Sequence, residues 1–188
     1  RNRCKHKMKV LEIFCGTMSF SRECELVGWE VTTVDINPKF NPTICTDILT
    51  WDYTTLPFVP DVFWAGIPCT TFSIASCKRN VLIGNVLALK TLEILKYFQE
   101  LNPNLIYGLE NPFSSLLKRQ PFMQGIPYKV CDYCQYGTRE EDNMGYKKRT
   151  IIFGNIDWIP KLCPGKGKCS EMEGNWHLEV AQHGKSAK

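Results

Sequence analysis

The sequence of 188 residues lacks any apolar run of the roughly eighteen residues that a membrane-spanning helix requires. Its first ten residues, RNRCKHKMKV, lack the apolar core of a secretion signal. We therefore expect no membrane partner and a soluble, intracellular protein, in the cytoplasm of a bacterial or virus-infected cell or in a nucleus. A GxGxxG turn is also missing, which disfavours a dinucleotide cofactor that carries a pyrophosphate.

Cysteine, in contrast, is abundant, with ten residues. In a short secreted chain this number would predict disulfides, but this chain has no signal and is long enough for a full core. We interpret the cysteines as reduced thiols, some of them reactive or metal-binding. The 23 basic and 19 acidic side chains give a net charge of +4, which permits contact with a polyanion without requiring it.

Short β-rich runs alternate with helical stretches. The expected strands cover residues 10–14, 30–34, 61–65, 105–109, 128–130 and 150–153. A long helix is predicted over residues 81–101, where apolar residues recur at steps of three and four, and a shorter one over residues 21–27. This alternation predicts an α/β fold, doubly wound around a mostly parallel sheet. We divide the chain into a catalytic domain (8–155), a small extension that contains cysteine and histidine (156–188) and a terminal segment of uncertain origin (1–7).

Polar residues follow several of these strands, at the edge of a parallel sheet where ligands bind. The Gly16 turn and Asp35, nineteen residues later, are typical of a nucleoside site, although a tight turn and a helix-capping acid would look the same. Cys69 is either a nucleophilic thiolate or a small core residue. Glu110 ends an apolar strand, where a carboxyl group can hold or donate a proton, or it caps a following helix.

Taken in order, these motifs resemble those of the C5-cytosine DNA methyltransferases. The shared pattern consists of Phe14-Cys15-Gly16, Asp35, Asp47, the hexad PCTTFS from Pro68 to Ser73, and Glu110-Asn111. The resemblance spans residues 10–155 and implies a Rossmann-like sheet of the kind that binds S-adenosylmethionine. Met18 stands where that family has a turn glycine, and Pro112 where it has valine. A typical target-recognition region does not fit the remaining length, so the resemblance is to a compact member.

The resemblance also implies roles for individual residues. S-adenosylmethionine would be held by Phe14, Gly16, Asp35, Ile36, Asp47 and Pro68. Cys69 would attack C6 of a cytosine, Glu110 would supply a proton or hydrogen bond at N3, and Arg149 would lie near the base. Ser73, Lys78, Arg79 and Asn111 would contact the substrate. Because C6 is shielded in a stacked duplex, the family takes the cytosine out of the helix.

The C-terminal region contains a set of thiols and imidazoles: Cys163, Cys169, His177 and His183. Four such groups suit tetrahedral zinc. In an alternative set, Cys131 and Cys134 supply half of the ligands together with Cys163 and Cys169. A further alternative leaves the cysteines free and the histidines exposed.

Two functions from different classes therefore compete. The first is a DNA cytosine-C5 methyltransferase with relaxed or short-site specificity, with RNA as the rival substrate and a recognition partner protein left open. The second is a catalytically silent module with a methyltransferase-like fold, which binds nucleic acid or has a regulatory role. A thiol oxidoreductase is disfavoured, because Cys69 has no second cysteine at Cys-x-x-Cys spacing.

Overall fold

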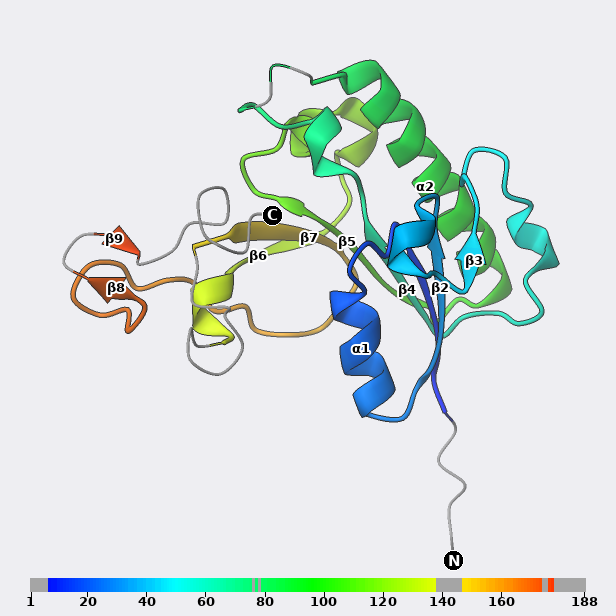
Figure 1. Ribbon diagram of the computed structural model, residues 1–188, viewed down its shortest axis with the longest axis horizontal. Helices are drawn as coiled ribbons and strands as arrows, with labels where there is room; N and C mark the ends of the chain where they lie inside the picture. Colours follow the sequence, from blue (N-terminus) through cyan, green and yellow to red (C-terminus); the bar gives the residue numbers. More distant parts are fainter. Residues whose placement is uncertain (1–6, 76, 78, 138–146, 174–175, 178–188) are drawn as a thin grey trace, which may run out of the picture.

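The structure, a computed structural model, describes residues 7–75, 77, 79–137, 147–173 and 176–177. Seven strands form one sheet in the order β3-β2-β1-β4-β5-β7-β6 (Figure 1). Their bounds are β1 Lys9–Ile13, β2 Glu30–Asp35, β3 Ile44–Cys45, β4 Val62–Gly66, β5 Ile106–Pro112, β6 Tyr128–Asp132 and β7 Arg149–Gly154. Strands β3, β2, β1, β4 and β5 pair in parallel, whereas β7 is antiparallel to both of its neighbours.

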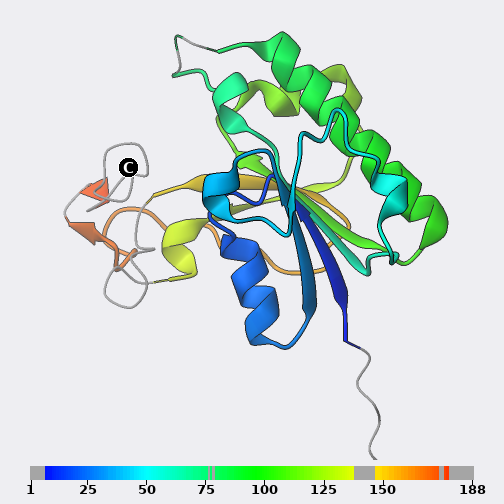
Figure 2. The same ribbon diagram turned by 45° about the vertical axis from the view of Figure 1, so that its right-hand side comes forward.

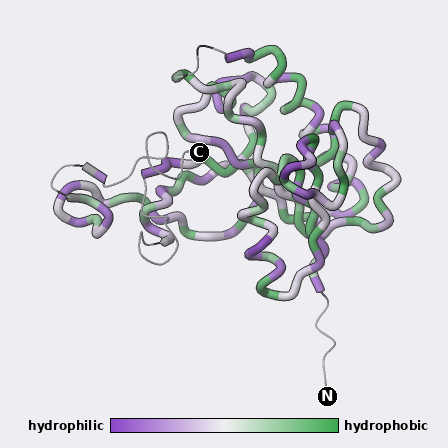
Figure 3. The backbone as a smooth tube through the Cα atoms, in the orientation of Figure 1, coloured by the Kyte–Doolittle hydropathy of each residue, from purple (hydrophilic) through white to green (hydrophobic). Residues whose placement is uncertain are grey.

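Helices cover both faces of the sheet, because alternate residues of each buried strand point to opposite sides. On β1, Leu11 and Ile13 belong to the large hydrophobic core under helix α2 (Val81–Leu101). Val10 lies in a smaller cluster with Cys24 of helix α1 (Ser19–Leu26). Figure 2 shows the two helices on opposite sides of the sheet, and Figure 3 shows hydrophobic segments gathered where the central strands run together. This confirms the doubly wound α/β fold.

Helix α2 has the bounds that its apolar spacing predicts. Asn80 caps its start by accepting a hydrogen bond from the Ile83 backbone N–H (3.2 Å). The helix ends at Leu101, directly before Asn102-Pro103, because proline cannot continue the ladder of hydrogen bonds. Ala88, Ile94 and Phe98 are buried against the sheet. The helix therefore anchors the connection that leads from β4 to β5.

The sequence predictions missed strand β3, which has only two residues and therefore too short a pattern to recognise. Helix α1 begins at Ser19, earlier than predicted. The remaining helical turns are of the 3₁₀ type. They are η1 (Pro38–Phe40), η2 (Tyr53–Thr55), η3 (Cys69–Thr71), η4 (Leu116–Arg119), η5 (Pro121–Met123) and η6 (Tyr133–Gln135).

The chain after β7 returns to the end of β6. The Asp132 backbone N–H donates to the Lys161 carbonyl (3.0 Å), and the Lys161 N–H donates to the Tyr136 hydroxyl (2.8 Å). A hairpin of β8 (Met172–Glu173) and β9 (Trp176–His177) lies beside η6 in both ribbon views. Within the described residues, no helix combines the length and the apolar character needed to cross a bilayer.

Gly154 ends β7 where the backbone of Tyr107 approaches it closely. A Cβ atom at Gly154 would lie 2.0 Å from the Tyr107 carbonyl oxygen, and a backbone atom cannot move aside as a flexible side chain can. We expect Gly154→Ala to lower the free energy of unfolding by about 3 kcal/mol in urea denaturation. Gly125→Ala is the matched control, because Gly125 also has a positive φ (85°) but open space around it. It should cost only about 1 kcal/mol, and equal losses would contradict the steric explanation.

Candidate active site

The turn after β1 is built from residues with left-handed backbone conformations. Phe14, Gly16 and Met18 have φ values of 55°, 48° and 59°. A Cβ atom at Gly16 would meet no atom within 4 Å, so this side of the turn is open. Met18 has a left-handed backbone conformation of the kind that favours glycine, and it precedes α1 without a capping side-chain hydrogen bond. The turn therefore forms despite the substitution, at the cost of backbone strain.

Asp35 joins this turn to the next loop. Its Oδ2 accepts the Gly16 backbone N–H (3.0 Å) and its Oδ1 accepts the Asn37 N–H (2.8 Å). A carboxylate has about four acceptor positions, so two remain for the hydroxyls of a ribose. Ile36, the next residue, is a large apolar side chain with 62% of its surface exposed. An open glycine turn, a carboxylate with acceptors to spare and an exposed apolar side chain fit a nucleoside cofactor.

Asp47 and Pro68 follow the ends of β3 and β4 at the same edge of the sheet. Asp47 uses Oδ1 to accept the Leu49 backbone N–H (3.0 Å). Pro68 precedes η3 and its carbonyl accepts the Thr71 hydroxyl (2.8 Å). Both are partly exposed, so the structure places them where a ligand at this edge can reach them.

Cys69 begins η3, in a loop that is held in place by contacts with Leu116 and helix α2. Phe72 is fully buried, and its carbonyl accepts the Leu116 backbone N–H (3.1 Å). Gly84 of α2 lets this loop approach, since a Cβ atom there would come within 2.6 Å of Thr71 and 2.7 Å of Phe72. The loop is therefore seated on α2, while Cys69 itself is exposed.

Glu110 lies within β5, directly opposite Gly66 of β4. Its side chain is 18% exposed and its Oε1 is 3.0 Å from the Lys148 ammonium. The Tyr133 hydroxyl donates to the same oxygen (3.4 Å), and Lys148 also lies over the Tyr133 ring. The carboxylate on this apolar strand is thus paired with a cation and accepts a hydrogen bond from a phenol. It also does not cap a helix.

Glu110 and Lys148 both influence Cys69. Partial loss of water around the sulfur is the largest effect, although the residue as a whole is exposed, and together with the Glu110 charge it raises the pKa of Cys69 above its ordinary value of 9.0. Lys148 acts in the opposite direction and lowers this pKa. The thiol, in the turn after β4, and the carboxylate, on the neighbouring strand β5, therefore lie at the same edge of the sheet. At neutral pH the resting thiol is mostly protonated.

Two predicted site residues lie elsewhere. Asn111, predicted to contact the substrate, is fully buried, and its Nδ2 donates to the Ile67 carbonyl (2.8 Å). It instead holds the loop that carries Cys69. Arg149 forms a two-bond pair with Asp132 (2.9 and 2.8 Å), on the face of the sheet opposite to Glu110. The cation beside Glu110 is Lys148, not Arg149.

Ser73, Lys78 and Arg79, which are predicted to contact the substrate, follow Cys69 in the sequence. The Ser73 hydroxyl accepts the Ala75 backbone N–H (3.3 Å), and Arg79 is exposed and reaches the Ser73 carbonyl (3.4 Å). Lys78 lies outside the described residues. Arg79 therefore lies on the loop that continues from the thiol, with its charge accessible from solvent.

The C-terminal cysteines do not join the Cys69 site but form a separate cluster. Its members are Cys134, Cys163, Cys169 and His177. The first set predicted from the sequence contains Cys163, Cys169 and His177, and the alternative set contains Cys134. Cys131 is not a member, and His183 lies outside the described residues.

The geometry can be compared with known proteins. The chain is 33% identical over 187 residues to the "Probable DNA (cytosine-5)-methyltransferase" of Frog virus 3 (isolate Goorha), a match that covers 89% of this chain and 80% of that protein. The chain belongs to the DNA (cytosine-5)-methyltransferase family. No protein-family model matches this member of the family.

Solved structures resemble this DNA (cytosine-5)-methyltransferase family member in fold. A precorrin-6Y C5,15-methyltransferase from Geobacter metallireducens GS-15 matches with a TM-score of 0.50 and 13% identity, over 82% of this chain and 83% of that chain. A SAM-dependent methyltransferase from Archaeoglobus fulgidus matches with a TM-score of 0.46 and 16% identity, over 80% and 87% of the two chains. The first of these likenesses supports a Rossmann-like methyltransferase fold.

Sequence reasoning missed Lys148 and Tyr133, although one signal for Lys148 was present. Alternate residues of a strand share a face, so in the run Lys147-Lys148-Arg149 only Lys148 shares the face of Ile152. Ile152 is the residue that pairs with Glu110. Finding Lys148 therefore required the register between β5 and β7. Tyr133 has no comparable signal, because it lies in the turn after β6.

The strain at Met18 leads to a stability prediction. A residue other than glycine in the left-handed region costs roughly 1–2 kcal/mol, part of which glycine returns through the greater entropy of the unfolded chain. We expect Met18→Gly to raise the free energy of unfolding by about 0.5–1 kcal/mol in urea denaturation. Ser19→Gly, one position into α1, should instead lower it by up to about 1 kcal/mol. Destabilisation by both variants would count against strain at Met18.

The charges around Cys69 predict the reactivity of its thiol. Since the Glu110 carboxylate raises the pKa of Cys69, Glu110→Gln should lower it and move the midpoint of iodoacetamide alkylation to lower pH. Lys148→Gln removes the group that lowers this pKa and should move the midpoint to higher pH. Alkylation is measured on the Cys69 peptide by mass spectrometry, so that the exposed Cys45 and Cys77 do not interfere. Shifts of the same sign in both variants would contradict the opposite effects of Glu110 and Lys148 on the pKa of Cys69.

Proposed function

We propose that this protein transfers a methyl group from S-adenosylmethionine to C5 of cytosine in DNA through a covalent adduct of Cys69. The observation that carries the proposal is the placement of Cys69 and Glu110. Cys69 begins the turn that follows β4, Glu110 lies on the adjacent parallel strand β5, and the Glu110 charge acts on the thiol. Membership of the DNA (cytosine-5)-methyltransferase family supports the same reaction.

The chemistry requires two groups at neighbouring positions of one ring. The Cys69 thiolate forms a bond to C6, and Glu110 holds or donates a proton at N3, so that electron density moves to C5. After C5 has been methylated, a base removes the C5 proton, and elimination breaks the C6–S bond and frees Cys69. Because the resting thiol has a raised pKa, the reaction begins with removal of its proton. Lys148 supports this step by stabilising the thiolate.

S-adenosylmethionine supplies an activated methyl group at the edge where β1, β2 and β4 end. Gly16 allows close backbone approach on the open side of its turn, and Asp35 accepts the ribose hydroxyls. Ile36 would offer an apolar surface for the adenine, and Asp47 would accept from its amino group. Phe14 and Pro68 border the same edge.

DNA is the proposed substrate, with the cytosine turned out of the duplex to reach Cys69. Ser73 and Arg79, on the exposed loop after the thiol, are placed to contact the backbone. Contacts from so few loop residues would give relaxed or short-site specificity, unless a partner protein adds recognition. RNA stays the rival substrate, and a silent binding module the rival function.

Methyl transfer tests the nucleophile. With tritiated S-adenosylmethionine and unmethylated DNA, Cys69→Ser should lower the rate by more than about a thousandfold, since the thiolate is the stronger nucleophile. Cys77→Ser removes an exposed thiol from the same loop and should retain activity. Duplex DNA with 5-fluorocytosine should stay attached to the wild-type protein in a denaturing gel, because the fluorine prevents the final elimination. Cys69→Ser should leave no such adduct.

The rival functions predict different results in the same assays. Transfer to RNA but not to DNA of the same sequence would replace the proposed substrate. No transfer to either, together with no heat of S-adenosylmethionine binding in calorimetry, would indicate the silent module. Transfer by Cys69→Ser at the wild-type rate would exclude the covalent mechanism.

A further inference from the structure

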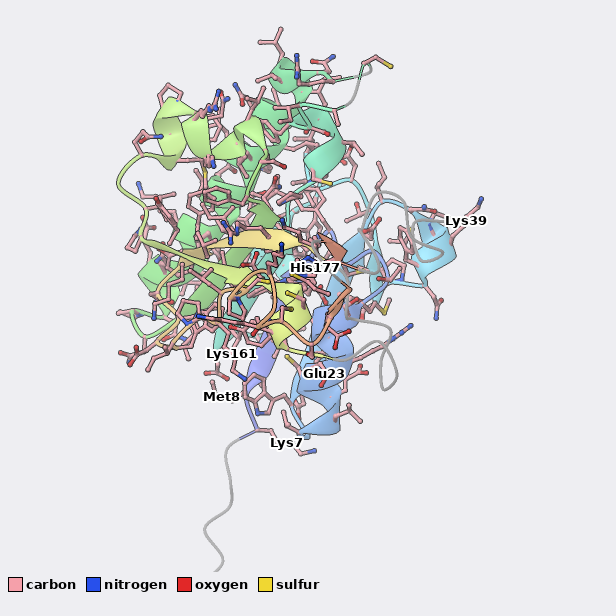
Figure 4. All side chains as sticks on the ribbon, turned by 90° about the vertical axis from the view of Figure 1, so that its left-hand side faces the viewer. Lys7, Met8, Glu23, Lys39, Lys161 and His177 are labelled. Atoms are coloured by element: carbon pink, nitrogen blue, oxygen red, sulfur yellow. The ribbon has the colours of Figure 1, made fainter. Side chains whose placement is uncertain are left out.

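A second cluster of reactive side chains lies at the end of the molecule that Figure 4 faces, where His177 is labelled. One ligand atom each from Cys134, Cys163, Cys169 and His177 lies within 4.8 Å of the other three. The four residues come from η6, the loop at 163–169 and strand β9. Three segments of the chain therefore converge on one point, although none of them is held there by a large hydrophobic core.

The spacing of these atoms matches a tetrahedral metal site. Zinc–sulfur bonds of about 2.3 Å and zinc–nitrogen bonds of about 2.0–2.1 Å place a sulfur and a nitrogen ligand about 3.5 Å apart. His177 Nε2 lies 3.4 Å from Cys163 Sγ and 3.7 Å from Cys169 Sγ. Three thiols and one imidazole are also the ligand types that favour zinc over the harder cations.

The surroundings of the sulfurs support a bound metal. The Gln135 side-chain amide donates to Cys134 Sγ (3.6 Å) and to Cys169 Sγ (3.4 Å). An N–H group that donates to two sulfurs stabilises the negative charge of thiolates, as outer partners of metal ligands do. A recess of about 340 Å³, lined in part by Cys134 and Cys169, gives an ion access to the ligands.

The chain is shaped locally to bring the ligands together. Gly165 and Gly167 have φ values of 83° and 74°, which lets the loop turn back so that Cys163 and Cys169 face the same point. The Cys163 backbone N–H donates to Asp132 Oδ2 (2.8 Å), and this anchors the start of the loop to β6. The β8–β9 hairpin, with strands of two residues each, is too short to be stable alone.

We propose that Cys134, Cys163, Cys169 and His177 bind one zinc ion that joins the C-terminal segment to the end of β6. Four protein ligands complete a tetrahedral shell and leave no position for water, so this zinc is structural. It holds together a region whose described strands, β8 and β9, have only two residues each. The set differs from both sets considered from the sequence, because Cys134 is a ligand and Cys131 is not.

Metal analysis of the purified full-length protein tests the site directly. We expect about one equivalent of zinc per chain, as for other structural sites. Cys163→Ser and His177→Ala should each lose most of it. Cys131→Ser is the matched control, since Cys131 is a buried cysteine of β6 outside the cluster, and it should keep its zinc. Wild-type protein with less than about a tenth of an equivalent, or Cys131→Ser losing as much zinc as Cys163→Ser, would overturn the proposal.

Cobalt substitution keeps the test decisive if a ligand variant fails to fold. Wild-type protein depleted of zinc and given Co²⁺ should show thiolate-to-cobalt charge transfer and the strong visible bands of tetrahedral coordination. Chelation should lower the thermal midpoint of the wild-type protein by several degrees, and added zinc should restore it. Octahedral cobalt spectra, or a midpoint that neither chelator nor zinc changes, would contradict a structural zinc site. Neither readout depends on methyl transfer.

Discussion

The insertion of β7 between β5 and β6 organises the site. Because β7 runs antiparallel to its neighbours, its first residues lie at the edge where the parallel strands end. Lys148, which precedes β7, therefore meets Glu110 near the end of β5. The same pairing makes β6 parallel to β5, so the end of β6 also reaches this edge and brings Tyr133 to Glu110. A fully parallel arrangement of the same strands would place Lys148 at the opposite edge.

The reactivity of Cys69 follows from two opposing charges of this arrangement. Burial and Glu110 raise the pKa of the thiol, whereas Lys148 lowers it. Lys148 also forms an ion pair with Glu110 (3.0 Å). The Glu110 charge therefore partly cancels the effect of the Lys148 charge on the pKa of Cys69. A protonated thiol is the expected resting state, and this limits oxidation and unspecific alkylation. A substrate ring that engages Glu110 would alter this balance where the nucleophile is needed.

Much of the fold could be predicted, because it depends on local patterns. The spacing in α2, the proline after it and the apolar strands all act within a few residues. The edge with Gly16, Asp35 and Cys69 follows from the topology rule for parallel sheets. The partners of Glu110 could not be predicted, because they depend on the register of β5 with β7, which is a long-range pairing. The resemblance pointed to Arg149 as the basic residue near the base, whereas the cation beside Glu110 is its neighbour Lys148.

The Cys and His cluster illustrates the same limit. Spacing along the chain favours ligands that are close in sequence, and this led to His183 as the fourth ligand. In the structure, Cys134 completes the set, because the end of β6 and the chain after β7 meet through hydrogen bonds at Asp132. The start of the loop with Cys163 is thus positioned by a hydrogen bond to the side chain of Asp132, which lies 31 residues earlier in the chain.

Three consecutive residues at the end of β6 serve three different contacts. Asp132 is fully buried and binds both the Arg149 guanidinium and the Cys163 backbone. Tyr133 points to the other side and donates to Glu110, and Cys134 turns into the metal-ligand cluster. Successive residues diverge in this way because a strand changes here into a 3₁₀ turn. The cluster of cysteines with His177 and the Tyr133 side chain beside Glu110 are therefore parts of one short segment, and the proposed zinc ion, by fixing Cys134, would also limit the motion of Tyr133.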